Sequence, residues 1–187
     1  MHDPASSRPS ADTIEQSIRS GRYRDAVGAC ARAHGTALGR FCMALLGNQA
    51  EADESVQETL IAAFDAFPGY RFESSVRTFL FGIARHQCAT RLAVRVRRER
   101  RLALVHDADE GPATPADLVE QRARAHRMRL ALDELRPSDR EALLLRYEAG
   151  LDFAEIGSAL GTPEATARKR VSRALVRLRD EFGEEAR

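Results

Sequence analysis

Apolar residues recur at steps of three and four along almost the whole readable chain, which is the spacing of one face of an α-helix. No segment alternates apolar and polar residues over a useful length, as a half-buried strand would. The spacing predicts helices from about Arg22 to Leu46, from Asn48 to about Phe67, and from near Ser75 into an arginine-rich end. We therefore expect an all-α protein.

An acidic stretch with helix-breaking residues interrupts this pattern. Residues 107–113 read Asp-Ala-Asp-Glu-Gly-Pro-Ala, and Thr114 to Asp117 then begin a further helix around Pro115. The chain is predicted to consist of a flexible tail, a small helical domain, a flexible linker and a second small helical domain, over residues 1–12, 13–104, 105–114 and 115–187.

Within the second domain, residues 152–173 have the pattern of a helix-turn-helix. Asp152 and Glu155 form a capping box for a short first helix. Gly161 suits the left-handed position of the turn, and Thr162 is then expected to cap a helix that starts at Pro163. Two helices joined by so short a turn are typical of DNA-binding proteins.

A supporting helix is expected before this motif. Ser138 and Glu141 have the spacing of another capping box, and Gly150 marks the end of the helix.

The second helix of the motif separates an apolar face from a basic one. The apolar residues that share a stripe are Ala167, Val171, Ala174, Leu175 and Leu178. A different stripe carries Thr166, Arg170, Arg173 and Arg177, with Lys169 beside it. Such a stripe is either a simply solvated surface or, as the more specific hypothesis, a surface that binds DNA in the major groove.

The helix that starts at Asn48 has an acidic face. Its predicted buried stripe is Val56, Leu60, Ala63, Phe64 and Phe67. Almost opposite lie Glu51, Glu54, Glu58 and Asp65. An acidic face of this kind is either simply solvated or a contact for a basic protein partner.

The segment from Tyr70 to Arg101 interleaves aromatic and basic residues. Exposed rings can stack on bases that have left a duplex, while arginines neutralise the neighbouring phosphates. Phe79 is in step with Leu80 and Ile83 and is better explained as a core residue. Tyr70 and Phe72 follow a Pro-Gly break and are candidates for base stacking.

Composition limits the classes of function. The 187 residues carry a formal net charge of +1, so affinity for nucleic acid has to come from local segregation of charge. Residues 91–101 are strongly basic, whereas residues 51–58 contain acidic residues and no basic one. No phosphate-cradling glycine loop, paired metal-binding carboxylates or nucleophile motif occurs, so we expect neither an enzyme nor a bound cofactor.

Cysteine usage and hydropathy limit the classes of function further. Cys30, Cys42 and Cys88 are odd in number and widely spaced, which indicates small buried residues rather than disulfides or a zinc site. The chain has no signal peptide and no apolar run of membrane-spanning length, which indicates a cytoplasmic location without membrane insertion.

These motifs together resemble the extracytoplasmic-function (ECF) sigma factors of bacterial RNA polymerase. Residues 52–59, 67–73 and 77–86 are similar to the second conserved region of that family, and residues 135–179 to its fourth. The resemblance implies a dissociable subunit that binds core RNA polymerase and directs promoter-specific initiation. It also implies one helical bundle for the −10 element and one helix-turn-helix domain for the −35 element.

The resemblance implies a role for each surface. In this family the helix that here carries Glu54, Gln57 and Glu58 docks on the largest subunit of the polymerase. Flipped bases of the −10 element are captured at positions that correspond to Tyr70, Arg71, Phe72, Glu73, Ser74, Arg77, Arg85 and His86. The −35 element is read at positions that correspond to Thr166, Arg168, Lys169, Arg170 and Arg173.

The chain departs from the family pattern at three positions. The family usually has Trp where Phe79 stands, Gly where Phe72 stands and Asn where His86 stands. Phe72 and His86 lie on the promoter-melting surface, so the −10 sequence that the family prefers cannot be assigned to this chain.

Two further expectations concern partners. The family implies an anti-sigma factor that clasps the two domains and hides both charged surfaces. A free-standing helix-turn-helix regulator that does not join the polymerase is the alternative function.

Overall fold

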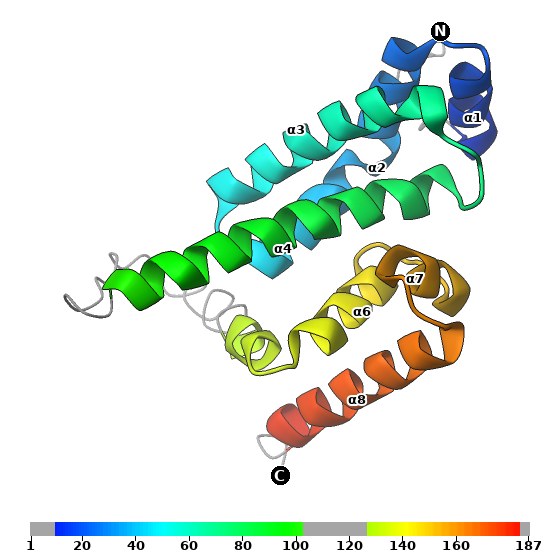
Figure 1. The fold of residues 1–187 in the computed structure, drawn as a ribbon. Helices are drawn as coiled ribbons and strands as arrows, with labels where there is room; N and C mark the ends of the chain where they lie inside the picture. The colour runs from blue at the N-terminus through cyan, green and yellow to red at the C-terminus, as the bar shows by residue number, and fades with distance from the viewer. Residues whose placement is uncertain (1–9, 103–126, 184–187) are drawn as a thin grey trace, which may run out of the picture.

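The computed structural model describes residues 10–102 and 127–183, and these ranges contain helices and no strand. The helices are α1 (Ala11–Arg19), α2 (Tyr23–Leu46), α3 (Gln49–Ala66), the single-turn 3-10 helix η1 (Phe67–Gly69), α4 (Val76–Leu102), α6 (Pro137–Tyr147), α7 (Phe153–Leu160) and α8 (Glu164–Gly183) (Figure 1). The prediction of an all-α fold is confirmed. The predicted acidic linker and the cap at Thr114 lie outside the described residues.

The first unit is a bundle in which α2, α3 and α4 run side by side and α1 packs at one end (Figure 1). Local signals set its helix ends as predicted. Gly47 ends α2 in the left-handed conformation, with φ of 69°, and its amide donates to the carbonyl of Met43. The side chain of Asn48 then accepts a hydrogen bond from the amide of Glu51 and caps α3.

The second unit is a helix-turn-helix formed by α7 and α8, with α6 packed against both. The predicted capping box is present, because Asp152 accepts from the amide of Glu155 and Glu155 accepts from the amide of Asp152. Gly161 adopts the left-handed conformation at φ of 61° and turns the chain into α8. A further helical segment, residues 127–133, precedes α6.

The structure corrects two predicted caps and adds one helix. Ser138 does not cap α6, because the helix starts one residue earlier at Pro137, whose fixed φ suits the first helical position. The hydroxyl of Thr162 is buried without a hydrogen-bond partner and therefore does not cap α8. The helix α1, which the sequence pattern does not reveal, is capped by Ser10 through the amide of Thr13.

The buried face of α3 is rotated from the predicted one. Its fully buried residues are Ala52, Ser55, Thr59 and Ala63. These small side chains let α3 pack closely on α2 and α4, and the Thr59 hydroxyl is satisfied by the carbonyl of Ser55 at 2.7 Å. Phe64, predicted in the core, is 38% exposed, so that part of the prediction is wrong.

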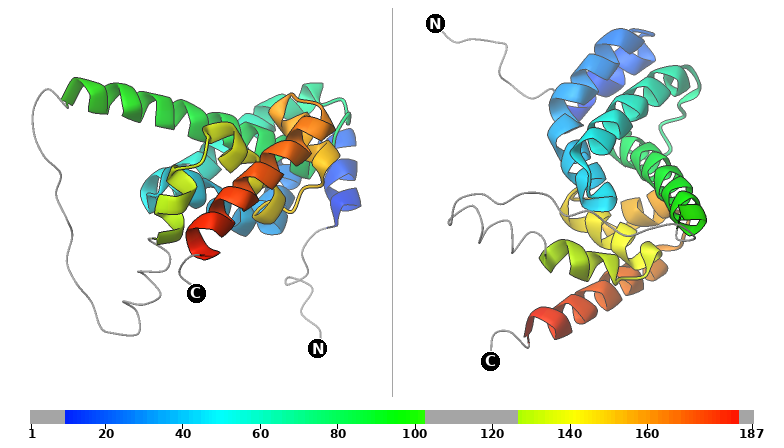
Figure 2. Two further views of the ribbon diagram at one scale, coloured as in Figure 1. Left: turned by 90° about the horizontal axis from the view of Figure 1, so that it is seen from below. Right: turned by 90° about the vertical axis from the view of Figure 1, so that its left-hand side faces the viewer.

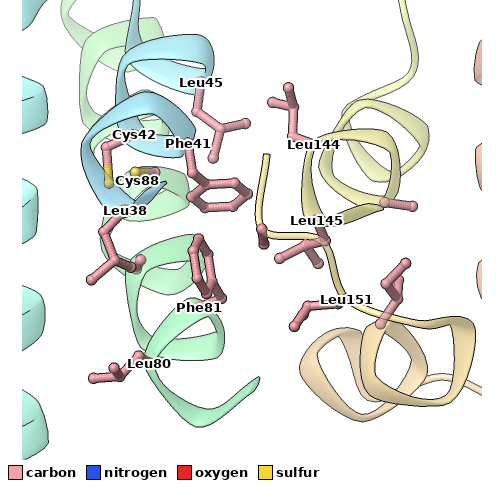
Figure 3. Close-up of a cluster of buried hydrophobic side chains, with 14 of the residues drawn as sticks. Leu38, Phe41, Cys42, Leu45, Leu80, Phe81, Cys88, Leu144, Leu145 and Leu151 are labelled. Atoms are coloured by element: carbon pink, nitrogen blue, oxygen red, sulfur yellow. The ribbon is translucent and has the colours of Figure 1, made fainter. Parts of the chain in front are cut away.

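The two units are packed together, with α6 against α2 and α7 against α4, and α8 lies on the side away from the first unit (Figures 1 and 2). Their buried apolar residues form one continuous cluster. The three cysteines are buried and free, as predicted, and all three belong to this cluster, in which Cys42 and Cys88 lie side by side (Figure 3). Burial raises the pKa of Cys30 to about 11, so that thiol stays protonated near neutrality.

Candidate polymerase and promoter interfaces

The acidic residues of α3 lie at the surface, but α4 neutralises part of their charge. Arg91 donates to a carboxylate oxygen of Glu54 at 2.9 Å and to one of Glu58 at 2.7 Å. One turn further along α4, Arg95 pairs with Glu51 and also donates to the carbonyl of Leu46. The acidic face is therefore held in place by arginines of the same bundle rather than being freely solvated.

An exposed apolar pair continues the line of Gln57 along α3. Ile61 is 62% exposed, and Phe64 follows it at helical spacing. Large apolar side chains that stay exposed beside one another mark protein contacts more often than scattered single ones do. The apolar pattern alone assigns Phe64 to the core and gives Ile61 no role, because residue type does not reveal exposure.

The loop after η1 folds its aromatic residues into a cluster. The ring of Tyr70 lies 4.7 Å from that of Phe72 and 4.8 Å from that of Phe79, measured between centroids. The Tyr70 hydroxyl donates to the carbonyl of Ser74, and burial raises the pKa of Tyr70. Tyr70 thus shapes the loop in this conformation, and its ring is half-buried rather than free to stack.

Phe72 is the only non-glycine residue of the described ranges with a positive φ, at 58°. A bulky residue is strained in this left-handed conformation, whereas glycine adopts it freely. The preference of the resembled family for glycine here therefore has a backbone reason. The guanidinium of Arg19 lies 3.8 Å above the Phe72 ring, so α1 holds this strained residue in place.

The remaining predicted −10 residues divide into two sets. Arg71, Glu73 and His86 are exposed, and Arg71 and Glu73 face each other at 3.8 Å as a weak surface pair. Ser74 and His86 line a hollow of about 450 Å³. Arg77 and Arg85 point instead to the second unit and bond to α6 and its end.

Two arginines of the predicted DNA stripe on α8 are occupied by carboxylates. Arg173 donates to both oxygens of Asp139, at 3.1 and 2.7 Å, and this bond raises the pKa of Arg173. Asp139 is buried, so its carboxylate depends on that guanidinium. Arg177 pairs with Glu134 at 3.3 Å. Arg173 and Arg177 therefore bond within the protein, on the side of α8 that faces α6 and the segment before it, and the contact of Arg173 with DNA stays a prediction.

The remaining predicted residues of α8 are more open. Lys169 is exposed and Arg170 half-buried, and neither forms an ion pair within the described ranges. Arg168 is exposed and bonded to Glu164 at 2.6 Å. Thr166 is half-buried near the start of the helix.

A basic hollow of about 370 Å³ lies between α8 and the ends of α6 and α7, and its lining includes Arg146, Phe153, Arg168 and Ser172. The guanidinium of Arg168 lies 4.5 Å from the Phe153 ring centre, and that of Arg146 lies 5.0 Å from it. Residues Arg146 and Ser172 are absent from the predicted stripe, since Arg146 belongs to a different helix and reaches α8 only through packing.

Known proteins match both units. The family model "Sigma-70 region 2" matches residues 30–101, and "Sigma-70, region 4" matches residues 125–178. The ECF RNA polymerase sigma factor SigC of Mycobacterium tuberculosis is 35% identical over 137 residues, which cover 71% of this chain and 70% of that one. The ECF RNA polymerase sigma factor SigD of the same organism is 36% identical over 155 residues, covering 76% and 70%.

The chain belongs to the ECF sigma factors. Among solved structures, the complex of the sigma factor RpoE with the anti-sigma factor NepR from Bartonella quintana has a TM-score of 0.62 at 26% identity and covers 79% of this chain and 91% of that one. The complex of CnrH with the cytosolic domain of CnrY has a TM-score of 0.69 at 22% identity, covers 94% and 99%, and supports the fold.

Membership in this family confirms the sigma-factor interpretation over that of a free-standing regulator, and the family consists of initiation factors rather than enzymes. The two region matches fall in the two packed units described above. Within residues 10–102 and 127–183, no helix is long and apolar enough to cross a membrane, and no group of His, Cys, Asp or Glu is arranged to hold a metal ion.

Proposed function

We propose that this ECF sigma factor joins core RNA polymerase through α3 and contacts promoter DNA with its two units at separate elements. The proposal rests on one observation: three surfaces of different chemistry lie on separate helices. The contact for the polymerase is an acidic and apolar face made by Glu54, Gln57, Glu58, Ile61 and Phe64. Arg91 orients the carboxylates of Glu54 and Glu58. Little further side-chain entropy is therefore lost when these carboxylates bind a basic partner.

The −10 surface comprises the loop of residues 70–74 and the adjoining part of α4. The hollow beside His86 is lined by polar and apolar side chains, among them Phe79 and Ile83 of α4, and by Ser158 and Ala159 of α7. Such a site suits an unstacked base, which needs an apolar face and hydrogen-bonding groups at its edge. Arg77 and Arg85 would neutralise phosphates of the melted strand.

The −35 surface is centred on Lys169 and Arg170, with Arg168 and Arg146 contributing from the Phe153 hollow. Arginine can bond in bidentate fashion to guanine in the major groove, and lysine adds phosphate contacts. Arg173 acts through its bond to Asp139, which positions α8 on α6. We assign Arg173 a positioning role in addition to its proposed contact with DNA.

The experiment that tests this function is transcription in vitro from a randomised promoter library. Purified core polymerase with this protein is expected to produce transcripts that start downstream of two enriched sequence elements, whereas core polymerase alone gives none. If the protein binds double-stranded DNA but core polymerase produces no transcripts in its presence, the protein acts as a regulator and not as the initiation subunit.

An anti-sigma factor is a further proposed partner. RpoE of Bartonella quintana is seen in complex with such a factor and is similar to this chain over most of its length. Co-purification from the native cell, followed by loss of transcription on adding the captured protein, would test the partner.

A further inference from the structure

The last turn of α1 is held firmly against the first unit. Ile14 and Ile18 are buried in the apolar core. Just after the helix, the amide of Arg22 donates to the carbonyl of Ser17 at 2.9 Å and closes the helix end. Arg19 lies in this last turn, so its side chain extends from a backbone position that is fixed.

The guanidinium of Arg19 lies over the ring of Phe72, in the loop between η1 and α4 (Figure 1). Its central carbon is 3.8 Å from the ring centroid. A cation over an aromatic face is attracted by the negative charge of that face. Arg19 also faces Glu15 one turn earlier, but a surface pair at 3.9 Å contributes little. The contact with Phe72 therefore joins α1 to a loop that is distant in the sequence.

The backbone of Phe72 depends on contacts of this kind. Its φ of 58° brings the β-carbon close to backbone atoms, which costs free energy for every residue except glycine. Such a conformation persists only where the surrounding structure holds it. Removal of the Arg19 guanidinium would allow Phe72 to return to an ordinary negative φ, and its ring would then move.

Phe72 is connected through Tyr70 to the hollow beside His86. The ring of Tyr70 lies 4.7 Å from that of Phe72 and 4.8 Å from that of Phe79, between centroids. The Tyr70 hydroxyl donates to the carbonyl of Ser74. Ser74 and Phe79 both line the hollow. A displaced Phe72 ring would therefore disturb two walls of the hollow.

We propose that Arg19 is a positioning residue for selection of the −10 base. It holds Phe72 in the left-handed conformation, and Phe72 in turn fixes Tyr70 and the Ser74 wall. The inference rests on the proposed function, in which the hollow beside His86 receives an unstacked base. A loosened loop would accept several bases, because the hydrogen-bonding groups at its edge would no longer have one position.

The competing role for Arg19 is a direct contact with a DNA phosphate, since its side chain is exposed. The substitution Phe72→Gly separates the two roles. It removes both the ring under Arg19 and the backbone strain, so a positioning arginine has nothing left to hold. A phosphate contact would keep its full effect in the Phe72→Gly background.

The first test needs no DNA. Arg71 is exposed, and the rate at which trypsin cuts the full-length protein after it reports how firmly the loop is held. Arg19→Ala is expected to raise this rate about two- to fivefold, the change that loss of an exposed cation–π contact produces. Arg19→Lys, which keeps a cation, should give an intermediate rate, and Arg19→Ala should have no effect in the Phe72→Gly background. Arg32→Ala, which removes an exposed cation from α2, is the control and should cut at the wild-type rate.

The second test measures base selection in the assembled holoenzyme. Each variant is combined with core polymerase and transcribes a promoter library that is randomised in the −10 element. Transcript sequencing gives the ratio of the preferred base to the other three, which does not depend on the amount of active enzyme. Arg19→Ala is expected to lower this ratio about two- to fivefold when Phe72 is present and to leave it unchanged in the Phe72→Gly background.

Three results would overturn the positioning role. One is an unchanged cleavage rate after Arg71 in Arg19→Ala. Another is an equal loss of base selection in both backgrounds, which would make Arg19 a direct DNA contact. The third is a base ratio that responds to His86→Ala but not to Arg19→Ala. Failure of the proposed −10 surface looks different: neither substitution would change the ratio, while cleavage after Arg71 would still respond to Arg19→Ala.

Discussion

At the scale of single residues, the carboxylate beside each arginine determines what that arginine does. Arg91 is committed to Glu54 and Glu58, and its role is to orient them. Arg173 is committed to the buried Asp139. Arg170, three residues earlier on α8, has no such partner in the described part of the chain. Neighbouring arginines on one helix should therefore respond differently to the same substitution.

Arg173→Ala is expected to lower the melting temperature by several degrees, because it leaves the Asp139 carboxylate buried and unpaired. Arg170→Ala is expected to leave the melting temperature unchanged and to weaken binding to the cognate −35 duplex by about 1 to 3 kcal/mol if it reads a base edge. Thermal denaturation and anisotropy on the same preparations separate these effects. Equal melting temperatures for the two variants would contradict the positioning role of Arg173.

Ile61 allows a similar test of the polymerase surface. Ile61→Asp is expected to weaken binding to core polymerase by about tenfold or more, since a charge would enter the centre of the contact. The fold should be unaffected, because the side chain is already 62% exposed. Val94→Asp on α4, at 58% exposed, is the matched control, and equal loss of polymerase binding in both variants would count against the assignment.

At the scale of elements, the helix-turn-helix depends on the close approach of α7 to the start of α8. Gly157 is buried in α7, and a Cβ atom there would lie 2.7 Å from the carbonyl oxygen of Thr162 and 3.3 Å from the amide nitrogen of Glu164. Both neighbours are backbone atoms, so the helices would have to move apart. The angle at which α8 is presented thus depends on a residue that makes no contact with DNA in the proposal.

Gly157→Ala is expected to reduce the free energy of unfolding by about 1 to 3 kcal/mol through overpacking. Gly35→Ala, in the interior of α2, where the added methyl meets no atom beyond the adjacent backbone of its own helix within 4 Å, is expected to increase it by about 0.5 to 1 kcal/mol. Urea denaturation measures both. A stabilising effect of Gly157→Ala would show that the turn does not require this close packing.

At the scale of the whole molecule, one continuous apolar cluster spans both units. Units that share buried contacts unfold together, whereas units joined only by a linker unfold independently. Calorimetry of the wild-type protein is therefore expected to show a single transition. Glu141→Lys, which disrupts the shared contact at Arg85, is expected to divide it into two, and two transitions already in the wild-type protein would contradict the packed arrangement.

Features that depend on neighbours along the chain could be predicted from the sequence. The ends of α2 and α3 follow from Gly47 and Asn48, and the capping box from Asp152 and Glu155, since each signal acts within one helical turn. The family was also identifiable, because its motifs are short, ordered segments. The location of the acidic face on α3 follows from helical periodicity.

Only the tertiary structure decided which of these surfaces are free. Arg91 and Glu54 are separated by 37 residues, and Arg85 and Glu141 by 56. A helical wheel orders residues on one helix but contains no information about which charges a second helix brings to it. Packing placed α4 beside α3, α6 beside α2 and α7 beside α4, and so determined that Arg77, Arg85 and Arg173 bond within the protein while Lys169 remains exposed.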